Sequence, residues 1–178
     1  MSDTLMSIIG IFFAVILMFI FPALEMANKT DEIAQTVSQV VVTDFVNKVA
    51  SKGKITEFDY NELQQKLYAT GNSYDIQIEV QILDDNPQRT AVTNSGGTDT
   101  GEIRYYSLYT NTILEKLSAT QEYFLKKDDY IIVTAKSTNI TIGTQFKNMF
   151  YKLIGKDTYA IGVSATAKIL NTNEKITF

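Results

Sequence analysis

The sequence predicts an α+β fold, in which a long N-terminal helix packs on an antiparallel β-sheet with short helices on one side. An uncharged apolar run from Thr4 to Leu24 leads without a loop signal into a stretch of helical periodicity. Later segments alternate between apolar and polar residues, as half-buried strands do. Short amphipathic segments that end at glycine lie among them, as expected of short helices.

The run from Thr4 to Leu24 contains no charged side chain over about 21 residues. At roughly 1.5 Å per residue, a helix of this length just crosses a hydrocarbon layer of about 30 Å. A buried core helix is disfavoured because residues 11–21 leave no polar face. We therefore expect residues 1–24 to be a transmembrane anchor.

A cleaved signal peptide is the alternative to a permanent anchor. Such a peptide carries a basic N-terminal region, a shorter apolar core and a small-x-small cleavage site. Here the only charged residue before the run is Asp3, but Ala23 and Ala27 leave cleavage open.

The apolar run continues into an amphipathic helix that we expect to pack on a domain. The apolar positions that recur at helical steps are Ile33, Val37, Val40, Val41, Val46 and Val49. One helix, kinked at Pro22, is expected to reach about Ser51 and to end at Gly53. Residues 25–178 are expected to form one α+β domain outside the cytoplasm.

A second helix and a clear strand follow. Thr56 is a plausible N-cap with Asp59 three residues later, and Gly71 is a stop signal. Residues 74–83 form the clearest strand, because apolar and polar residues alternate strictly along it. The side chains expected to point inward are Ile76, Ile78, Val80 and Ile82, and those expected outward are Asp75, Gln77, Glu79 and Gln81.

The remaining elements are shorter. Residues 103–109 alternate again, and a helix is expected over 111–118. Residues 122–125 and 130–138 are predicted to form two hairpin strands around the polar turn 126–129. An amphipathic helix is expected over 145–155, and the last strand lies within 157–170. The inward residues of that strand are Ile161, Val163, Ala165 and Ala167.

The composition excludes several classes of function. The chain has 178 residues, no histidine and no cysteine, which removes Ser-His-Asp and Cys-His catalysis and zinc thiolate sites. A net charge of −4 gives no basic footprint for nucleic acid. We therefore expect no enzyme, no cofactor and no metal site.

Acidic residues and a glycine-containing loop were considered as sites. The acidic residues lack the spacing of a calcium-binding loop and are predicted to stabilise turns instead. They are Asp84, Asp85, Asp99, Glu102, Asp128 and Asp129. Residues 94–101 lack the Gly-Lys-Ser/Thr of a phosphate-binding loop and are read as solvated. Tyr105, Tyr106 and Tyr109 favour sheet packing over a carbohydrate or partner platform.

The layout resembles a known family. The apolar helix with Pro22, its amphipathic continuation and the sheet behind it resemble the plan of type IV pilins and pseudopilins. Residues 128–170 contain a strand, a linker, a small helix, a glycine and a terminal strand rich in Ala and Thr. They are similar to the TadE/TadG-like minor pilins and pseudopilins of tight-adherence (Flp-type) pilus systems, in their divergent Gram-positive form.

This resemblance implies a membrane-anchored structural subunit of a type IV-related pilus or secretion apparatus. Its partners would be membrane lipid and other pilin-like subunits or pilus assembly proteins, including further copies of the chain. One motif departs from the family, whose precursors carry a basic leader, a glycine before the cut and a glutamate five residues after it. Gly10 is the only glycine of the apolar run, Val15 is the fifth residue after it, and no Lys or Arg precedes it. The departure favours an accessory or minor subunit.

Small residues in the apolar run are the expected contact points between helices. Apolar burial brings no gain between helices in lipid, so close packing of small residues matters more. The predicted packing residues are Ser7, Gly10, Ala14, Pro22 and Ala23, although they would serve equally as membrane filler. A tethered binding or sensor module, with a ligand near residues 93–101, and an anchored hydrolase are the competing functions.

Overall fold

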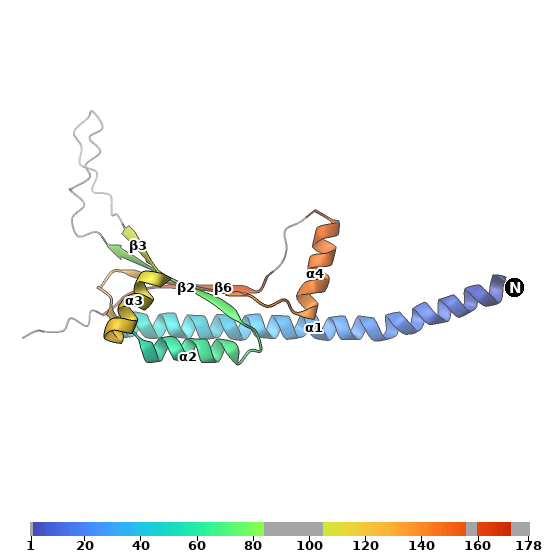
Figure 1. The fold of residues 1–178 in the computed structure, drawn as a ribbon, viewed down its shortest axis with the longest axis horizontal. Helices are drawn as coiled ribbons and strands as arrows, with labels where there is room; N and C mark the ends of the chain where they lie inside the picture. Colours follow the sequence, from blue (N-terminus) through green and yellow to red (C-terminus); the bar gives the residue numbers. More distant parts are fainter. Residues whose placement is uncertain (1, 84–104, 156–159, 172–178) are drawn as a thin grey trace, which may run out of the picture.

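One helix of 51 residues, α1 (Ser2–Lys52), runs the length of the protein and carries every other element on its C-terminal half (Figure 1). The computed structural model of the chain describes residues 2–83, 105–155 and 160–171. Gly53 ends the helix as predicted, with a positive φ of 65° and its N–H donating to the Val49 carbonyl at 2.8 Å. Pro22 lies inside α1, which continues unbroken through it, and in Figure 1 the N-terminal part of the helix curves away from the line of the rest.

A four-stranded antiparallel sheet in the order β3-β2-β5-β6 lies against α1. Its strands are β2 (Tyr74–Leu83), β3 (Tyr105–Tyr109), β5 (Tyr130–Ser137) and β6 (Gly162–Lys168). Val80 pairs with Leu108 on one side and with Ile131 on the other, and its complete burial confirms the predicted inward orientation. The α+β class and the alternation of β2 and β6 are therefore confirmed.

A second, two-stranded sheet joins β1 (Lys54–Thr56) to β4 (Glu122–Phe124). The predicted hairpin of residues 122–138 is wrong, because β4 and β5 belong to different sheets. The reason lies in the polar segment between them. The buried Asp129 carboxylate accepts hydrogen bonds from the backbone N–H of Lys126 at 2.9 Å and of Leu83 at 3.2 Å. These bonds turn the chain from one sheet to the other.

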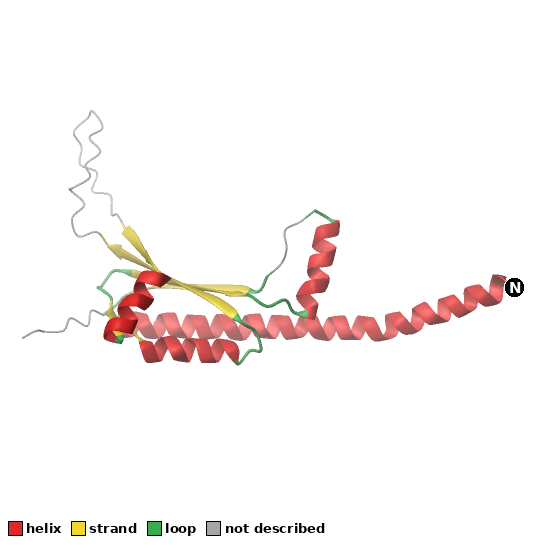
Figure 2. Ribbon diagram, in the orientation of Figure 1, coloured by secondary structure: helices red, strands yellow, loops and turns green. Residues whose placement is uncertain are grey.

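Three shorter helices complete the described part of the fold (Figure 2). They are α2 (Glu57–Tyr68), α3 (Thr110–Thr120) and α4 (Ile142–Leu153). Thr56 caps α2 as predicted, since its side chain accepts the Asp59 N–H at 3.1 Å. The helix α2 packs against α1, whereas α4 touches α1 near its own first turn and points away from it.

The core lies between α1, α2, α3 and the inner face of the large sheet. Its fully buried side chains include Ile55, Leu63, Leu67, Ile78, Ile113, Ile131, Ile161, Ile169, Val42, Val46, Val49 and Val80. The expected inward role of Val46 and Val49 is thus confirmed, and Val41 packs at the edge of the core.

The predicted inward face is wrong for the middle of α1. Ile33, Val37 and Val40 are 64%, 43% and 54% exposed. The residues that face the domain there are Asp31, Ala34, Ser38 and Val42. Small and polar residues occupy this face because the neighbouring elements come close and hydrogen-bond to it; the Ser38 hydroxyl, for example, donates to the Tyr74 hydroxyl at 2.7 Å.

Candidate functional site

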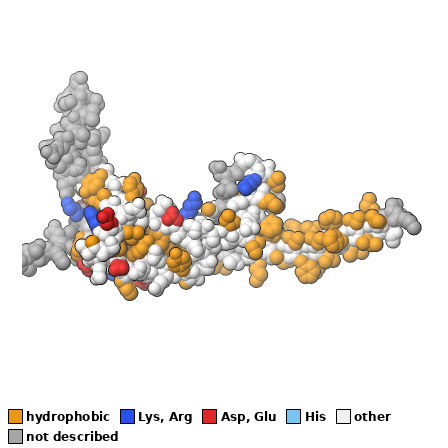
Figure 3. All heavy atoms as spheres, viewed as in Figure 1, with side chains coloured by type: hydrophobic (Ala, Val, Ile, Leu, Met, Phe, Trp, Pro, Cys, Tyr) orange, Lys and Arg blue, Asp and Glu red, His pale blue; other side chains and the backbone are white. Residues whose placement is uncertain are grey.

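The most prominent surface of the protein is the apolar N-terminal part of α1, residues 4–24, called the arm below (Figure 3). No other described element covers it. Its large side chains that are more than half exposed are Leu5, Met6, Ile8, Ile11, Phe12, Phe13, Leu17, Met18, Phe19 and Phe21. Among the residues that the structure describes, α1 is the one helix long and apolar enough to cross a membrane, and its most apolar window is wholly unburied. A signal sequence meets the same criterion.

The five predicted packing residues all lie on the exposed surface of the arm. Ser7, Gly10 and Ala14 follow one another at steps of three and four residues and so share one helix face. Nothing lies within 4 Å of a Cβ built on Gly10, so the described fold itself does not require glycine there. Ala23 follows Ala14 by nine residues, which is two and a half turns, and therefore faces the opposite side.

A second apolar surface continues from the arm onto the part of α1 that carries the domain. It consists of Ile33, Val37 and Val40 and is called the spine stripe below. These residues recur at steps of four and three and stand on the side of α1 away from the domain. Their helical periodicity predicts packing on the domain, and their exposure shows that this prediction is wrong. Asp31 and Ser38 lie on the opposite side of α1 and need hydrogen-bond partners when buried. These two polar residues are the feature of the sequence that could have indicated which side of α1 faces the domain.

The base of α4 is fixed to α1 by a buried polar joint. The Asp31 side chain, 3% exposed, accepts hydrogen bonds from the hydroxyls of Thr141 at 2.8 Å and Thr144 at 3.3 Å. Thr141 also accepts the backbone N–H of Thr144 at 3.1 Å, so it caps the helix. A carboxylate at this position also lies favourably at the positive end of the α4 dipole.

Gly143 permits the close approach of α4 to α1. A Cβ added there would lie 2.6 Å from Asp31 Oδ2 and 3.2 Å from the Ala27 backbone. The glycine therefore lets α4 start directly on the surface of α1.

A network of opposite charges joins the other end of α1 to α2. Lys48 Nζ lies 2.7 Å from Asp59 Oδ1 and 2.6 Å from Glu62 Oε2, and Lys52 Nζ lies 3.1 Å from Asp59. The hydrogen bonds from Lys48 and Lys66 lower the pKa of Glu62 to about 2. Burial opposes ionisation of Asp59, but hydrogen bonds from Lys48, Thr56 and Lys52 outweigh it and lower its pKa. This arrangement stabilises the helix pair and contains no group poised to transfer a proton at neutral pH.

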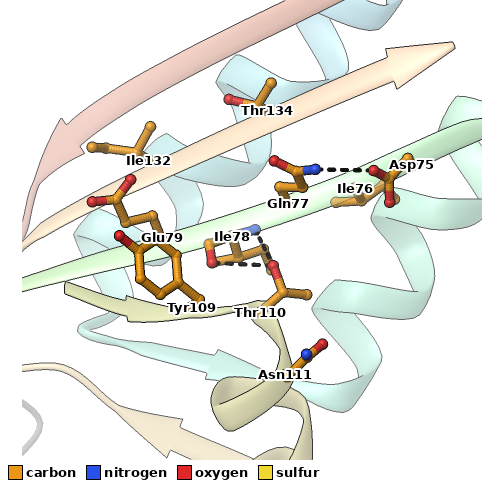
Figure 4. Close-up of a pocket in the computed structure, with 10 residues that line it drawn as sticks. All are labelled: Asp75, Ile76, Gln77, Ile78, Glu79, Tyr109, Thr110, Asn111, Ile132 and Thr134. Atoms are coloured by element: carbon orange, nitrogen blue, oxygen red, sulfur yellow. Dashed lines mark hydrogen bonds between the residues drawn. The ribbon is translucent and has the colours of Figure 1, made fainter.

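The outer face of the large sheet carries an open depression of about 340 Å³ between β2, β5 and the start of α3 (Figure 4). Several of its polar groups are bonded to one another or to residues beside it. Gln77 donates to Asp75 at 3.0 Å, and the Thr110 hydroxyl accepts the Ile78 N–H at 2.7 Å. Glu79, which also borders the depression, accepts the Ser107 hydroxyl at 2.6 Å.

The remaining candidate sites are the three tyrosines, the acidic residues and the glycine-containing loop. Tyr105 makes an edge-to-face contact with Tyr130 at 5.5 Å, whereas Tyr106 and Tyr109 remain more than half exposed. In the described parts of the chain no group of three or more acidic, His or Cys side chains could hold a metal ion. The loop 94–101 and the acidic residues at 84, 85, 99 and 102 lie outside the described residues.

The fold and this surface define an α+β protein built on one long helix whose apolar half is covered by no other described element. Comparison with known protein families, curated proteins and solved structures finds no match to it.

Proposed function

We propose that this protein is a membrane-anchored, pilin-like structural subunit, a minor pilin or pseudopilin, of a type IV-related pilus or secretion apparatus. Its arm anchors it in the membrane and packs laterally against the arms of other subunits. The rest of α1 then holds the α+β domain outside the cytoplasm.

The exposed arm carries this proposal. Burial of one large apolar side chain contributes about 1.5–3 kcal/mol, and the arm leaves about ten such side chains uncovered. An arm of this kind needs either lipid or other apolar helices around it. The length of the arm matches one crossing of a bilayer, which supports lipid as the main surroundings of the arm.

The spine stripe favours a subunit that assembles over a simple tether. A tethered binding or sensor module requires the arm but gives no reason for Ile33, Val37 and Val40 to be apolar on the side away from the domain. Assembly supplies one, because helices that pack side by side in the membrane can continue to pack beyond it. The resemblance to pilins, whose long helices are the packing elements, agrees with this reading.

Disulfide crosslinking in native membranes tests the proposal, since the chain has no cysteine of its own. Val37→Cys places a thiol on the spine stripe, and Glu32→Cys places one on a different exposed side of α1, about 7.5 Å nearer the arm. Oxidation should give dimers and larger products from position 37 and several-fold fewer from position 32. Equal or absent crosslinking at native expression would instead favour a tethered monomer.

A further inference from the structure

The helix α4 leaves α1 at the level where a membrane-spanning arm would enter the headgroup region. Its Gly143 lies against Ala27 and Asp31, three and seven residues beyond Leu24. At 1.5 Å per residue these positions lie about 5–10 Å past the end of the arm. The headgroup zone on each side of the hydrocarbon layer is roughly 5–8 Å thick. The base of α4 therefore falls within or at the edge of this zone.

The direction of α4 fits the same location. Figure 1 shows α4 standing across the axis of α1 instead of lying along it or on the sheet. An arm that crosses a membrane along its normal would therefore place α4 roughly parallel to the membrane surface. The joint of Asp31, Thr141 and Thr144 holds this crossing in place.

The side chains of α4 separate into an apolar and a polar side. Ile142, Phe146, Met149 and Leu153 recur at steps of four, three and four residues and so form one stripe. Ile142, Met149 and Leu153 are 67%, 51% and 76% exposed, and Ile154 just beyond the helix is 63% exposed. This is the most amphipathic of the described helices, yet three of the four residues of its apolar stripe are more than half exposed, and only Phe146 is half-buried.

The polar side of α4 faces the domain. Thr144, Gln145, Asn148 and Lys152, together with Met149 from the border of the apolar stripe, line a cavity of about 510 Å³ whose opposite wall is residues 137–140. Ile142, Leu153 and Ile154 do not line that cavity. Figure 3 shows hydrophobic side chains on the side of α4 toward the arm. The apolar stripe thus turns toward the region that a membrane around the arm would occupy.

We infer that α4 is an interfacial helix that lies on the phospholipid surface of the membrane crossed by the arm. Its stripe enters the boundary between headgroups and acyl chains, as amphipathic helices of this pattern do. Lys152 on the polar side extends its ammonium group toward the headgroups and water. Because the buried bonds to Asp31 hold the base of α4 on α1, α4 fixes both the depth of α1 and its rotation about its own axis.

This inference rests on the membrane anchoring in the proposed function, so the experiment reports on both. The full chain is reconstituted in vesicles of phosphatidylcholine and phosphatidylglycerol with a single environment-sensitive fluorophore. Leu153→Cys carries the fluorophore on the apolar stripe, and Gln145→Cys carries it on the polar side of the same helix. Phe13→Cys reports on the arm, and Asn61→Cys on α2 reports on the exposed domain.

The label at position 153 should be quenched by brominated lipid and protected several-fold from aqueous iodide relative to labels at 145 and 61. Iodide quenching at 153 equal to that at 145, with position 13 protected, would overturn the interfacial helix and leave the anchor intact. Exposure of position 13 to iodide would overturn the anchor and the inference together. Protection at 153 without lipid quenching, accompanied by disulfide dimers from Leu153→Cys, would assign the stripe to a second copy and overturn the inference.

A double substitution on the apolar stripe tests independently whether α4 positions α1. Met149→Gln with Leu153→Gln removes apolar surface at exposed positions, so the domain should keep its melting temperature. The depth distribution of the fluorophore at Phe13→Cys should then become several-fold broader. Quenching by lipids brominated at different carbons measures this distribution. An unchanged depth profile would count against a role for α4 in positioning α1.

Discussion

Lys48 Nζ lies 2.7 Å from Asp59 Oδ1, and this contact joins the long helix α1 to α2 at the end of the molecule farthest from the arm. The Asp59 side chain is completely buried, whereas that of Lys48 remains 35% exposed. A buried carboxylate of this kind needs its charged partners to stay ionised. Lys48 therefore helps to hold α2 on the part of α1 that carries the domain.

The charge network predicts a loss of stability in acid. Hydrogen bonds from Lys48 and Lys66 lower the pKa of Glu62 from 4.5 to about 2, and the pKa of Asp59 is lowered as well. Carboxylates with a depressed pKa stabilise the fold above their unfolded pKa, and this contribution is lost as the pH falls through the folded value. The melting temperature, measured by circular dichroism, should therefore fall between about pH 4.5 and pH 2.

Lys48→Met tests the origin of this pH dependence. At neutral pH it should destabilise the fold by about 1–3 kcal/mol, because the buried Asp59 loses a charged hydrogen bond. It should also flatten the acid part of the profile. Lys136→Met, at an exposed position on β5, is the matched control and should leave the profile unchanged. If the melting temperature fell equally steeply with pH in both variants, another group would control the loss of stability in acid.

The alternation of β2 was predictable because each step along a strand reverses the side-chain direction, so the pattern alone assigns the two faces. The end of α1 was predictable for a similar local reason, since Gly53 takes up the left-handed backbone easily. The second sheet was not predictable. Its pairing of Ile55 with Tyr123 joins residues far apart in the chain, and its short strands have too little alternation to give a signal.

The candidate site was predicted in part. The uncharged run predicted the arm directly, because a helix long and apolar enough to cross a membrane is recognised by composition alone. The prediction for the face of α1 beyond the arm was wrong. A valine such as Val37 is typical of a core, and its identity does not show whether it faces the domain or the solvent. Burial of Asp31 depends on Thr141 and Thr144, which lie more than a hundred residues away. Long-range polar contacts of this kind leave no periodic trace in the sequence.

A substitution on the inner face of the sheet should be far more damaging than one on the outer face. Val80 is completely buried, so Val80→Asp places an uncompensated carboxylate in the core and should destabilise the fold by several kcal/mol. Thr166→Asp on β6 points to solvent and should change stability by less than about 0.5 kcal/mol. Urea unfolding of the two variants gives the comparison, and similar midpoints would contradict the assignment of the faces.

The turn between β4 and β5 should depend on Asp129 and hardly at all on its neighbour. Asp129→Ala leaves the backbone N–H groups of Lys126 and Leu83 without their acceptor, for an expected loss of about 1–3 kcal/mol. Asp128→Asn keeps a residue that tolerates the positive φ of 75° and loses only a half-exposed ion pair with Lys168. Thermal unfolding should therefore show a clear shift for the first variant and almost none for the second. The reverse order would show that the ion pair, and not the buried carboxylate, organises the turn.

The last prediction concerns the arm and separates packing residues from membrane filler. Because Ser7, Gly10 and Ala14 share one face, Ser7→Cys should give disulfide dimers in native membranes, whereas Phe12→Cys, well away from that face, should give several-fold fewer. Adding Gly10→Leu to the Ser7→Cys chain should then reduce the dimers. A Cβ at this position meets no atom of the described protein within 4 Å, so a reduction of the dimers would point to contacts between molecules. Membrane fractionation and the melting temperature of the domain should remain as in the Ser7→Cys chain. Unchanged dimers in the presence of Gly10→Leu would mean that the small residues are filler, and that any lateral contact of the arm uses another face.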